Sequence, residues 1–226
     1  MTIRRLFAAP LLLLAACQQP VGAAPSEGAV LAPVPTVRAS EAGTRQTAVF
    51  SGGCYWGIEA VFSHLRGVTS AVSGFQGGAR ATARYDLVSR DDTGHAESVR
   101  VTYDPRVVHY DQLLQVFFSV GADPTQLNRQ GPDTGPQYRS ALVPLTAEQD
   151  KVARAYLQQM AAARVWRGRI VTRIEPNRGF FPASEDHQDF AAKNPDHPYI
   201  RYWDVPKVAA LKQLFPALYQ PGFTRG

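Results

Sequence analysis

The sequence has little cysteine, no long hydrophobic run and no dense block of charge, and each shortage excludes a class of protein. Only two of its 226 residues are cysteine, too few for a secreted fold held by disulfides. The longest apolar stretch, residues 6–16, is too short to cross a membrane comfortably. The net charge of +5 is spread out and no recognition motif accompanies it, so no nucleic-acid partner is expected. With 45% hydrophobic residues, the chain is predicted to contain one packed domain.

The first residues have the pattern of an export signal. Arg4 and Arg5 precede the apolar residues 6–16, as in a secretory leader. The leader ends in Leu14-Ala15-Ala16-Cys17, which resembles the lipobox of bacterial lipoproteins. The resemblance implies a signal peptide over residues 1–16, a lipid on Cys17, and a protein anchored to a membrane on the periplasmic side of a bacterial envelope. An ordinary secretory leader in which the cysteine occurs by chance is the alternative.

The next segment is poor in large apolar residues. Residues 18–44 are rich in Ala, Pro, Gly and Ser, a composition that buries too little surface to order a chain. The sequence therefore predicts a lipid-anchored flexible linker over residues 17–44 and a catalytic domain over residues 45–226.

Apolar spacing and turn residues predict the elements of this domain. Strands are expected over residues 46–50, 68–75, 97–103, 138–142 and 169–174, and helices over residues 55–65, 110–120, 146–163, 184–193 and 204–215. The order of the first six elements is typical of the split β-α-β of ferredoxin-like folds. The predicted class is α/β (α+β) with a mixed sheet, extra helices and a long C-terminal tail. The polar loop over residues 123–137 is long enough to be functional.

Cys54 lies where the first strand turns into the first helix. Unpaired backbone N–H groups and the helix dipole would favour its thiolate, which is the reactive form. Gly53 and Gly57 are expected to let a substrate approach the backbone closely. Tyr55 and Trp56 suggest an apolar surface beside the sulfur, although two aromatic core residues at a helix start would look the same.

Residues 53–57, Gly-Cys-Tyr-Trp-Gly, resemble the GCFWG signature of A-type methionine sulfoxide reductases. The resemblance extends over about residues 47–215. Further segments follow in that family's order: Gly74-Phe75-Gln76-Gly77-Gly78, Thr93-Gly94-His95-Ala96-Glu97, Tyr103-Asp104-Pro105, Asp123-Pro124-Thr125-Gln126, Asn128-Arg129-Gln130-Gly131, Gln137-Tyr138-Arg139-Ser140, Glu185-Asp186-His187-Gln188 and Lys193-Asn194-Pro195.

The resemblance implies a role for each matching residue. Cys54 is the nucleophile, Glu97 the catalytic proton donor, Tyr55 and Trp56 the cup for the substrate methyl group, Tyr85 and Tyr138 the further partners of the sulfoxide oxygen, and Asp133 a support from the long loop. The chemistry is consistent, because a buried carboxylic acid can give a proton to the oxygen while a thiolate attacks the sulfur. Without the motif, Glu97 would be read as a solvated carboxylate and the two tyrosines as core or rim residues.

Several positions depart from the family's pattern. Tyr55 replaces the commoner Phe, Phe75-Gln76 stands for Tyr-Ala, and Pro136 stands for Thr. Residues 79–84 differ from the loop of many members, so Tyr85 is assigned from its spacing to Glu97.

The implied activity is thiol-dependent reduction of the S epimer of methionine sulfoxide, free and in oxidised exported proteins. Residues 196–226 hold no resolving cysteine, and Ser89 occupies the other candidate position. An external reductant, a thioredoxin-like protein or a small thiol, is therefore expected to recycle Cys54. No cofactor is expected, and no metal, because the five histidines lack ligand spacing. A monomer is expected. The alternatives are a thiol peroxidase, a thioredoxin-like reductase, which the absence of C-x-x-C disfavours, and an anchored module that binds methionine sulfoxide without turnover.

Overall fold

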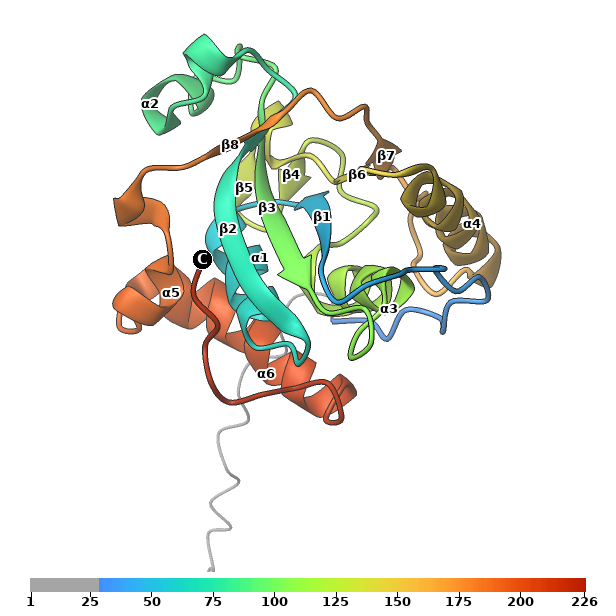
Figure 1. The fold of residues 1–226 in the computed structure, drawn as a ribbon. Helices are drawn as coiled ribbons and strands as arrows, with labels where there is room; N and C mark the ends of the chain where they lie inside the picture. Colours follow the sequence, from blue (N-terminus) through green and yellow to red (C-terminus); the bar gives the residue numbers. More distant parts are fainter. Residues whose placement is uncertain (1–28) are drawn as a thin grey trace, which may run out of the picture.

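A six-stranded sheet forms the centre of the computed structural model, which describes residues 29–226 (Figure 1). The strands are β1 Gln46–Ser51, β2 Val68–Gln76, β3 Ala96–Tyr103, β4 Arg129–Gln130, β5 Asp133–Thr134, β6 Ala141–Val143, β7 Arg173–Ile174 and β8 Phe180–Pro182. The α-helices are α1 Tyr55–Ser63, α2 Tyr85–Val88, α3 Tyr110–Val116, α4 Ala147–Ala163, α5 Phe190–Lys193 and α6 Val205–Leu214.

The sheet has the topology that the sequence predicts. Its order is β7-β6-β1-β3-β2-β8, and β1, β2, β3 and β6 pair only antiparallel among themselves. Helix α1 follows β1 and α3 follows β3, which makes this core the split β-α-β of ferredoxin-like folds. Because β7 pairs parallel with β6, the sheet is mixed, and both parts of the prediction are confirmed.

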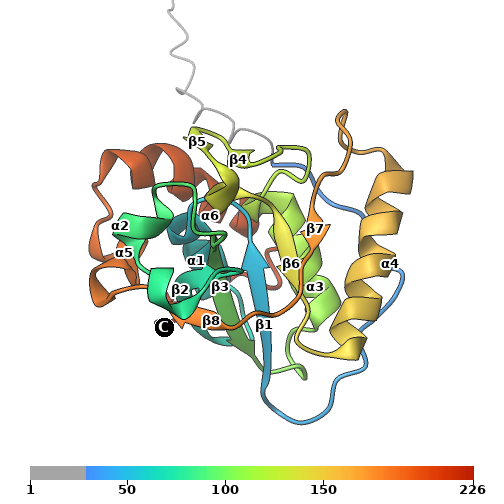
Figure 2. The same cartoon turned by 90° about the horizontal axis from the view of Figure 1, so that it is seen from above.

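The core lies between the sheet and the helices α1 and α3. The ring of Phe50 on β1 is 4.9 Å from that of Phe62 on α1, and 6.1 Å from that of Tyr110 on α3. One face of the sheet therefore contacts both helices. Figure 2 shows α5 and α6 beside α1, and α4 beside α3.

The helix predicted over residues 184–193 is two short pieces. A 3-10 turn covers Glu185–His187, and α5 begins at Phe190. Between them, the Gln188 side chain accepts a hydrogen bond from Ser73 N–H and donates one to Ser73 C=O, both at 2.9 Å. The next residue, Asp189, adopts a left-handed conformation with φ of 52°. The side-chain bonds to β2 hold the chain out of helical geometry, which helical spacing alone does not reveal.

Other boundaries differ at turns. Helix α1 ends at Ser63, and the strand predicted from residue 138 begins at Ala141 after a 3-10 turn over Pro136–Tyr138. The loop over residues 123–137 contains the small hairpin of β4 and β5. Strand β8, which pairs with β2, was not predicted because three residues ending in proline carry little strand signal.

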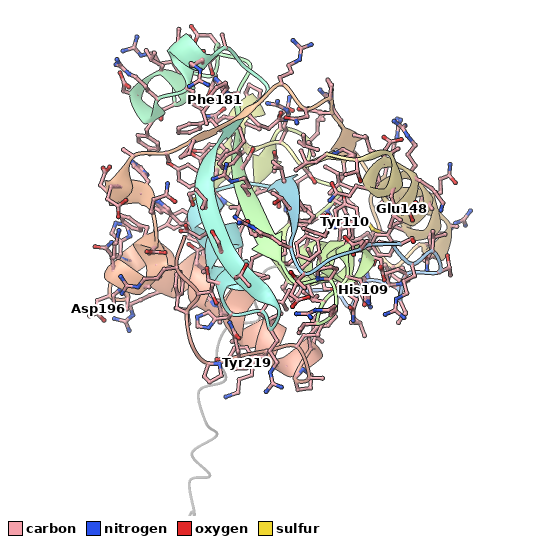
Figure 3. The ribbon with its side chains drawn as sticks, viewed as in Figure 1. His109, Tyr110, Glu148, Phe181, Asp196 and Tyr219 are labelled. Atoms are coloured by element: carbon pink, nitrogen blue, oxygen red, sulfur yellow. The ribbon has the colours of Figure 1, made fainter. Side chains whose placement is uncertain are left out.

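Part of the predicted linker is packed against the domain. Ala32 and Ala39 are buried, and the segment runs along α3 and α4, where Figure 3 labels Tyr110 and Glu148. Ala39 N–H donates to Asp111 at 2.9 Å, Ser40 N–H to Glu148 at 3.0 Å, and the Tyr156 hydroxyl to Pro33 C=O at 2.7 Å. The expectation of a free linker is therefore wrong for residues 30–41. Small side chains and backbone hydrogen bonds hold the segment, and composition does not report these.

The C-terminal tail returns along α1. An isolated bridge joins Leu65 to Tyr219, which Figure 3 labels, and Thr224 N–H donates to Ser63 C=O at 2.9 Å. The predicted signal peptide and Cys17 lie outside the described residues. Within residues 29–226, no helix is both long and apolar enough to span a membrane.

Candidate active site

Cys54 sits at the junction of β1 and α1, where it is the N-cap of the helix. Only 8% of the residue is exposed. The chain reaches this position through Gly53, whose φ of +95° is a conformation that other residues rarely adopt. The tight turn aims the sulfur at the first turn of α1, and the Trp56 N–H lies close enough to stabilise the thiolate.

The two glycines beside Cys54 make room for protein side chains. A Cβ atom on Gly53 would lie 2.6 Å from the Cβ of Gln130, and one on Gly57 would lie 2.1 Å from Asp204 Oδ1. The expectation that these glycines admit the substrate is therefore wrong for this structure. Gly53 admits the β4–β5 hairpin, and Gly57 admits the ion pair of Asp204 with Lys207, whose atoms are 3.2 Å apart.

The surroundings of Cys54 favour the thiol over the thiolate. Burial raises the pKa of the Cys54 thiol well above its usual range, and the charges of Glu97, Asp204 and Asp133 raise it further. The Trp56 N–H lowers the pKa but does not outweigh them. Burial beside these groups therefore acts against the helix start, which by itself favours the thiolate.

Glu97 lies directly beside the start of α1. It is 3% exposed, and its Oε2 accepts the Tyr55 N–H at 3.0 Å. Burial raises the pKa of Glu97 to about 8, although the Tyr55 N–H lowers it. A carboxyl group with this pKa is mostly protonated at neutral pH and can donate its proton.

Asp133 comes to the site from β5 in the long loop. Its carboxylate accepts a hydrogen bond from the Tyr199 hydroxyl. Burial raises the pKa of Asp133 against the opposing effects of Tyr199 and Lys207. A carboxyl group held in this way adds to the acidic surroundings of Cys54.

Tyr85 and Tyr138 complete the group. Burial raises the pKa of each, and the charges of Glu97, Cys54 and Asp133 raise it further. The structure therefore brings every residue of the predicted oxygen-binding set within electrostatic reach of Cys54. They differ in access, because Tyr85 is 41% exposed on α2, whereas Tyr138 is partly buried.

Known proteins are similar to this chain over most of its length. Residues 46–217 match the family model described as peptide methionine sulfoxide reductase. A relative from Mesorhizobium japonicum named peptide methionine sulfoxide reductase MsrA 2 is 55% identical, over 77% of this chain and 89% of its own length. Another of the same name, from a Synechocystis species, is 48% identical over 75% of this chain and 79% of its own length.

The chain belongs to the peptide methionine sulfoxide reductase family.

Two solved structures of such reductases share its fold. Methionine sulfoxide reductase A of Corynebacterium diphtheriae is 34% identical with a TM-score of 0.57, covering 76% of this chain and 83% of that one. The reduced form of Mxr1 from Saccharomyces cerevisiae is 29% identical with a TM-score of 0.60, covering 72% of this chain and 92% of that one.

In this reductase, Tyr55 and Trp56 differ in their access to a substrate. Tyr55 is 1% exposed, so its ring lies beneath the site. Trp56 is partly exposed and stacks on Phe190, with ring centroids 3.7 Å apart and an interplanar angle of 8°. Trp56 is thus the more accessible of the two predicted methyl-binding rings.

The structure adds three residues that the sequence analysis did not assign to the site. Tyr199 bonds to Asp133, Asp204 lies against α1, and the His187 Nδ1 is 2.8 Å from the Tyr55 hydroxyl. His187 belongs to one of the segments that resemble the family, so the sequence contained a sign that it lies near the site. Tyr199 and Asp204 carried no local signal, because their roles depend on how the C-terminal part folds back. Within residues 29–226, no group of three or more His, Cys, Asp or Glu side chains is placed to bind a metal ion.

Proposed function

We propose that the reductase uses Cys54 to reduce the S epimer of methionine sulfoxide, free and in proteins, and that Glu97 is the proton donor. The observation that carries the proposal is the position of Glu97. Its carboxyl group is buried beside the Cys54 turn, bonds to the Tyr55 N–H, and has a pKa of about 8. It therefore holds a proton at neutral pH next to the reacting sulfur.

The proposed step transfers oxygen between two sulfur atoms. Glu97 gives its proton to the sulfoxide oxygen, the Cys54 sulfur attacks the substrate sulfur, and the Cys54 proton returns to the Glu97 carboxylate. The oxygen then passes to the Cys54 sulfur, where a sulfur–oxygen bond forms while the sulfur–oxygen bond of the substrate and the sulfur–sulfur bond made by the attack both break. Methionine and a Cys54 sulfenic acid remain. Tyr85 and Tyr138 donate hydrogen bonds to the oxygen without carrying charge. Such a step starts from the thiol, which suits the raised pKa of Cys54.

An external thiol completes the cycle in this proposal. It attacks the sulfenic acid, water leaves, and a second thiol reduces the mixed disulfide. The reductant is a thioredoxin-like protein or a small thiol. Residues 1–16 have the pattern of a secretory leader and precede Cys17, so we place the enzyme on the periplasmic side of a bacterial envelope, held by lipid and repairing oxidised exported proteins.

Epimer-resolved turnover tests the activity. A peptide with both epimers of methionine sulfoxide is incubated with the full chain and dithiothreitol or thioredoxin, and the epimers are separated. We expect loss of the S epimer only, and no loss with Cys54→Ser. Consumption of the R epimer, or an active Cys54→Ser variant, would overturn the proposal.

The anchor has a separate test in the native host. The mature N-terminus is analysed by mass spectrometry, and we expect a lipid-modified Cys17. A single acyl chain binds a membrane only marginally, so two or more chains are expected. An unmodified Cys17, or cleavage at another bond, would contradict the anchor but not the activity.

A further inference from the structure

The Tyr55 hydroxyl makes a contact that phenylalanine, the commoner residue of the resembling motif, could not make. Its oxygen is 2.8 Å from the Nδ1 of His187. The Tyr55 ring is 1% exposed and lies 5.8 Å from that of Phe75, centroid to centroid, so packing fixes the direction of the hydroxyl. A buried phenol at this position needs a hydrogen-bond partner, and His187 is that partner.

His187 links three aromatic rings around the reacting sulfur. Its ring centroid is 4.4 Å from that of Tyr85 and 5.7 Å from that of Trp56, and its plane is inclined by 24° to the Trp56 ring. The hydrogen bond from Tyr55 fixes the rotation of the imidazole. The same imidazole thus contacts both the Tyr55 hydroxyl and the Tyr85 ring.

His187 is held in its neutral form. Burial lowers the pKa of His187, and the opposing charge of Asp186 does not reverse the effect. Asp186 Oδ2 lies 3.8 Å from Nε2, which favours the proton on Nε2 and leaves Nδ1 to accept the Tyr55 O–H. The bond thus runs from Tyr55 to His187.

The other contacts of Tyr85 hold its backbone and helix, because Val88 of α2 is buried and the Ser89 hydroxyl donates to the Tyr85 C=O at 2.6 Å. Tyr85 is 41% exposed and begins the four-residue helix α2, which projects from the sheet in Figure 1. Another anchor of this loop is Arg80, whose guanidinium lies 5.1 Å from the ring centroid of Phe181, labelled in Figure 3. That contact holds the loop to β8 but not the Tyr85 ring to the site. The His187 ring, with its centroid 4.4 Å from that of Tyr85, contacts the Tyr85 ring itself.

We propose that Tyr55 and His187 are positioning residues, which act on the reduction by holding Tyr85 in place. The inference rests on the proposed function, because it needs Tyr85 to bond the sulfoxide oxygen. Neither the Tyr55 hydroxyl nor the His187 ring has to touch the substrate for this role.

Single-turnover kinetics of the full chain test the proposal. Tyr55→Phe keeps the ring and removes only the hydroxyl. We expect it to slow reduction of an S-epimer peptide by about 3- to 10-fold, the range for one lost hydrogen bond. The matched control is Tyr156→Phe, which removes a hydroxyl bonded to Pro33 C=O at 2.7 Å. The control is expected to keep the wild-type rate.

A double-mutant cycle separates positioning from a general loss of stability. If Tyr55 acts through Tyr85, then Tyr55→Phe changes the rate less than twofold when Tyr85→Phe is already present. His187→Asn keeps a polar partner for Tyr55 but removes the ring, and it should slow the reaction at least as much as Tyr55→Phe. Additive effects in the cycle, or a wild-type rate with His187→Asn, would overturn the proposal.

Amide hydrogen exchange gives a measurement independent of catalysis. Residues 79–92 should exchange faster in Tyr55→Phe than in the wild type, and at the wild-type rate in Tyr156→Phe. Unchanged exchange in Tyr55→Phe contradicts the inference and leaves the proposed function standing. If wild-type enzyme reduces no S epimer, the proposed function fails, whereas the exchange result still reports whether Tyr55 holds the loop.

Discussion

At the Glu97 carboxyl, burial and one backbone amide act in opposite directions on a single proton. Burial stabilises the neutral acid, whereas the Tyr55 N–H stabilises the carboxylate, and the resulting pKa is about 8. At neutral pH, Glu97 therefore mostly keeps the proton that the proposed reaction needs to give to the sulfoxide oxygen. A carboxyl group in water would have lost it near pH 4.5.

Replacing Glu97 by Gln removes the acid and keeps the shape. We expect the single-turnover rate of reduction to fall by about 10²–10⁴-fold, the range for general acid catalysis. The matched control is Glu59→Gln. Glu59 is also a buried carboxyl group but lies on α1, and its replacement should leave the rate within about twofold at neutral pH. A near-normal rate with Glu97→Gln would remove Glu97 from the mechanism.

The same proton predicts a pH dependence. Glu97 donates only when protonated, so the rate of the reductive step should decline as the pH rises through about 8, the pKa of Glu97. A stopped-flow profile from pH 6 to 10 measures this decline. The Glu97→Gln variant should lack it, and a wild-type rate that stays level to pH 10 would contradict the assignment.

Among the elements, helix α1 begins directly after the nucleophile and contains an unusual buried carboxyl group. Glu59 is fully buried, and neither carboxylate oxygen has a hydrogen-bond partner within the described part of the chain. Burial raises the pKa of Glu59 to about 8 from an ordinary value of 4.5. The neutral form therefore belongs to the folded state, and the charged form opposes folding.

The stability of the protein should respond to this group in a defined pH window. Because the folded-state pKa is raised, its contribution is complete below pH 4.5 and is lost as the pH rises through about 8. Glu59→Gln should thus gain free energy of unfolding relative to wild type as the pH rises from about 4.5 to about 8, by about 1.4 kcal/mol per unit of pKa shift at most. Denaturant unfolding at several pH values measures it. Parallel curves for the two proteins would refute the idea.

Elements with regular spacing were predictable, and those shaped by distant contacts were not. The sequence predicts a helix over residues 146–163, and α4 covers Ala147–Ala163 with the Thr146 side chain as its cap. The interruption at Gln188 depends on hydrogen bonds to Ser73 on β2. No local pattern in the sequence encodes that pairing.

In the site, too, some features were predictable from local sequence and others depend on distant contacts. The motifs around Cys54 and Glu97 predict one site for both residues, and the Glu97 carboxyl accepts the Tyr55 N–H at the start of α1. Burial raises the pKa of Cys54 most, followed by Glu97, Asp204 and Asp133, and the last two come from distant segments. Residues that reach the site by tertiary folding change its electrostatics without leaving a local signal.

At the scale of the whole molecule, the domain is larger than its motifs suggest. Chains that begin at residue 29 and at residue 45 can be compared by denaturant unfolding. Loss of the bonds from residues 30–41 to α3 and α4 should destabilise the shorter chain by about 1–3 kcal/mol, since each bond adds about 1 kcal/mol and ordering the segment offsets part of it. Equal stabilities would show that the segment adds nothing.

The whole chain also decides how the enzyme is regenerated. Cys54 is the only cysteine after residue 17, so a chain that begins at residue 29 has no thiol to attack the oxidised sulfur. Treated with excess S-epimer substrate and no reductant, it should form one methionine per chain and rest as a sulfenic acid that dimedone traps. Intact mass and methionine release measure both quantities.

Added thiol provides the control, because it should restore repeated turnover. Without it, the sulfenic acid remains open to irreversible oxidation to the sulfinic acid. Preincubation with substrate and peroxide, without thiol, should therefore inactivate the enzyme. Dithiothreitol added afterwards should not restore its activity. Two or more methionines per chain without thiol would mean that another group reduces Cys54, and the one-thiol cycle would be wrong.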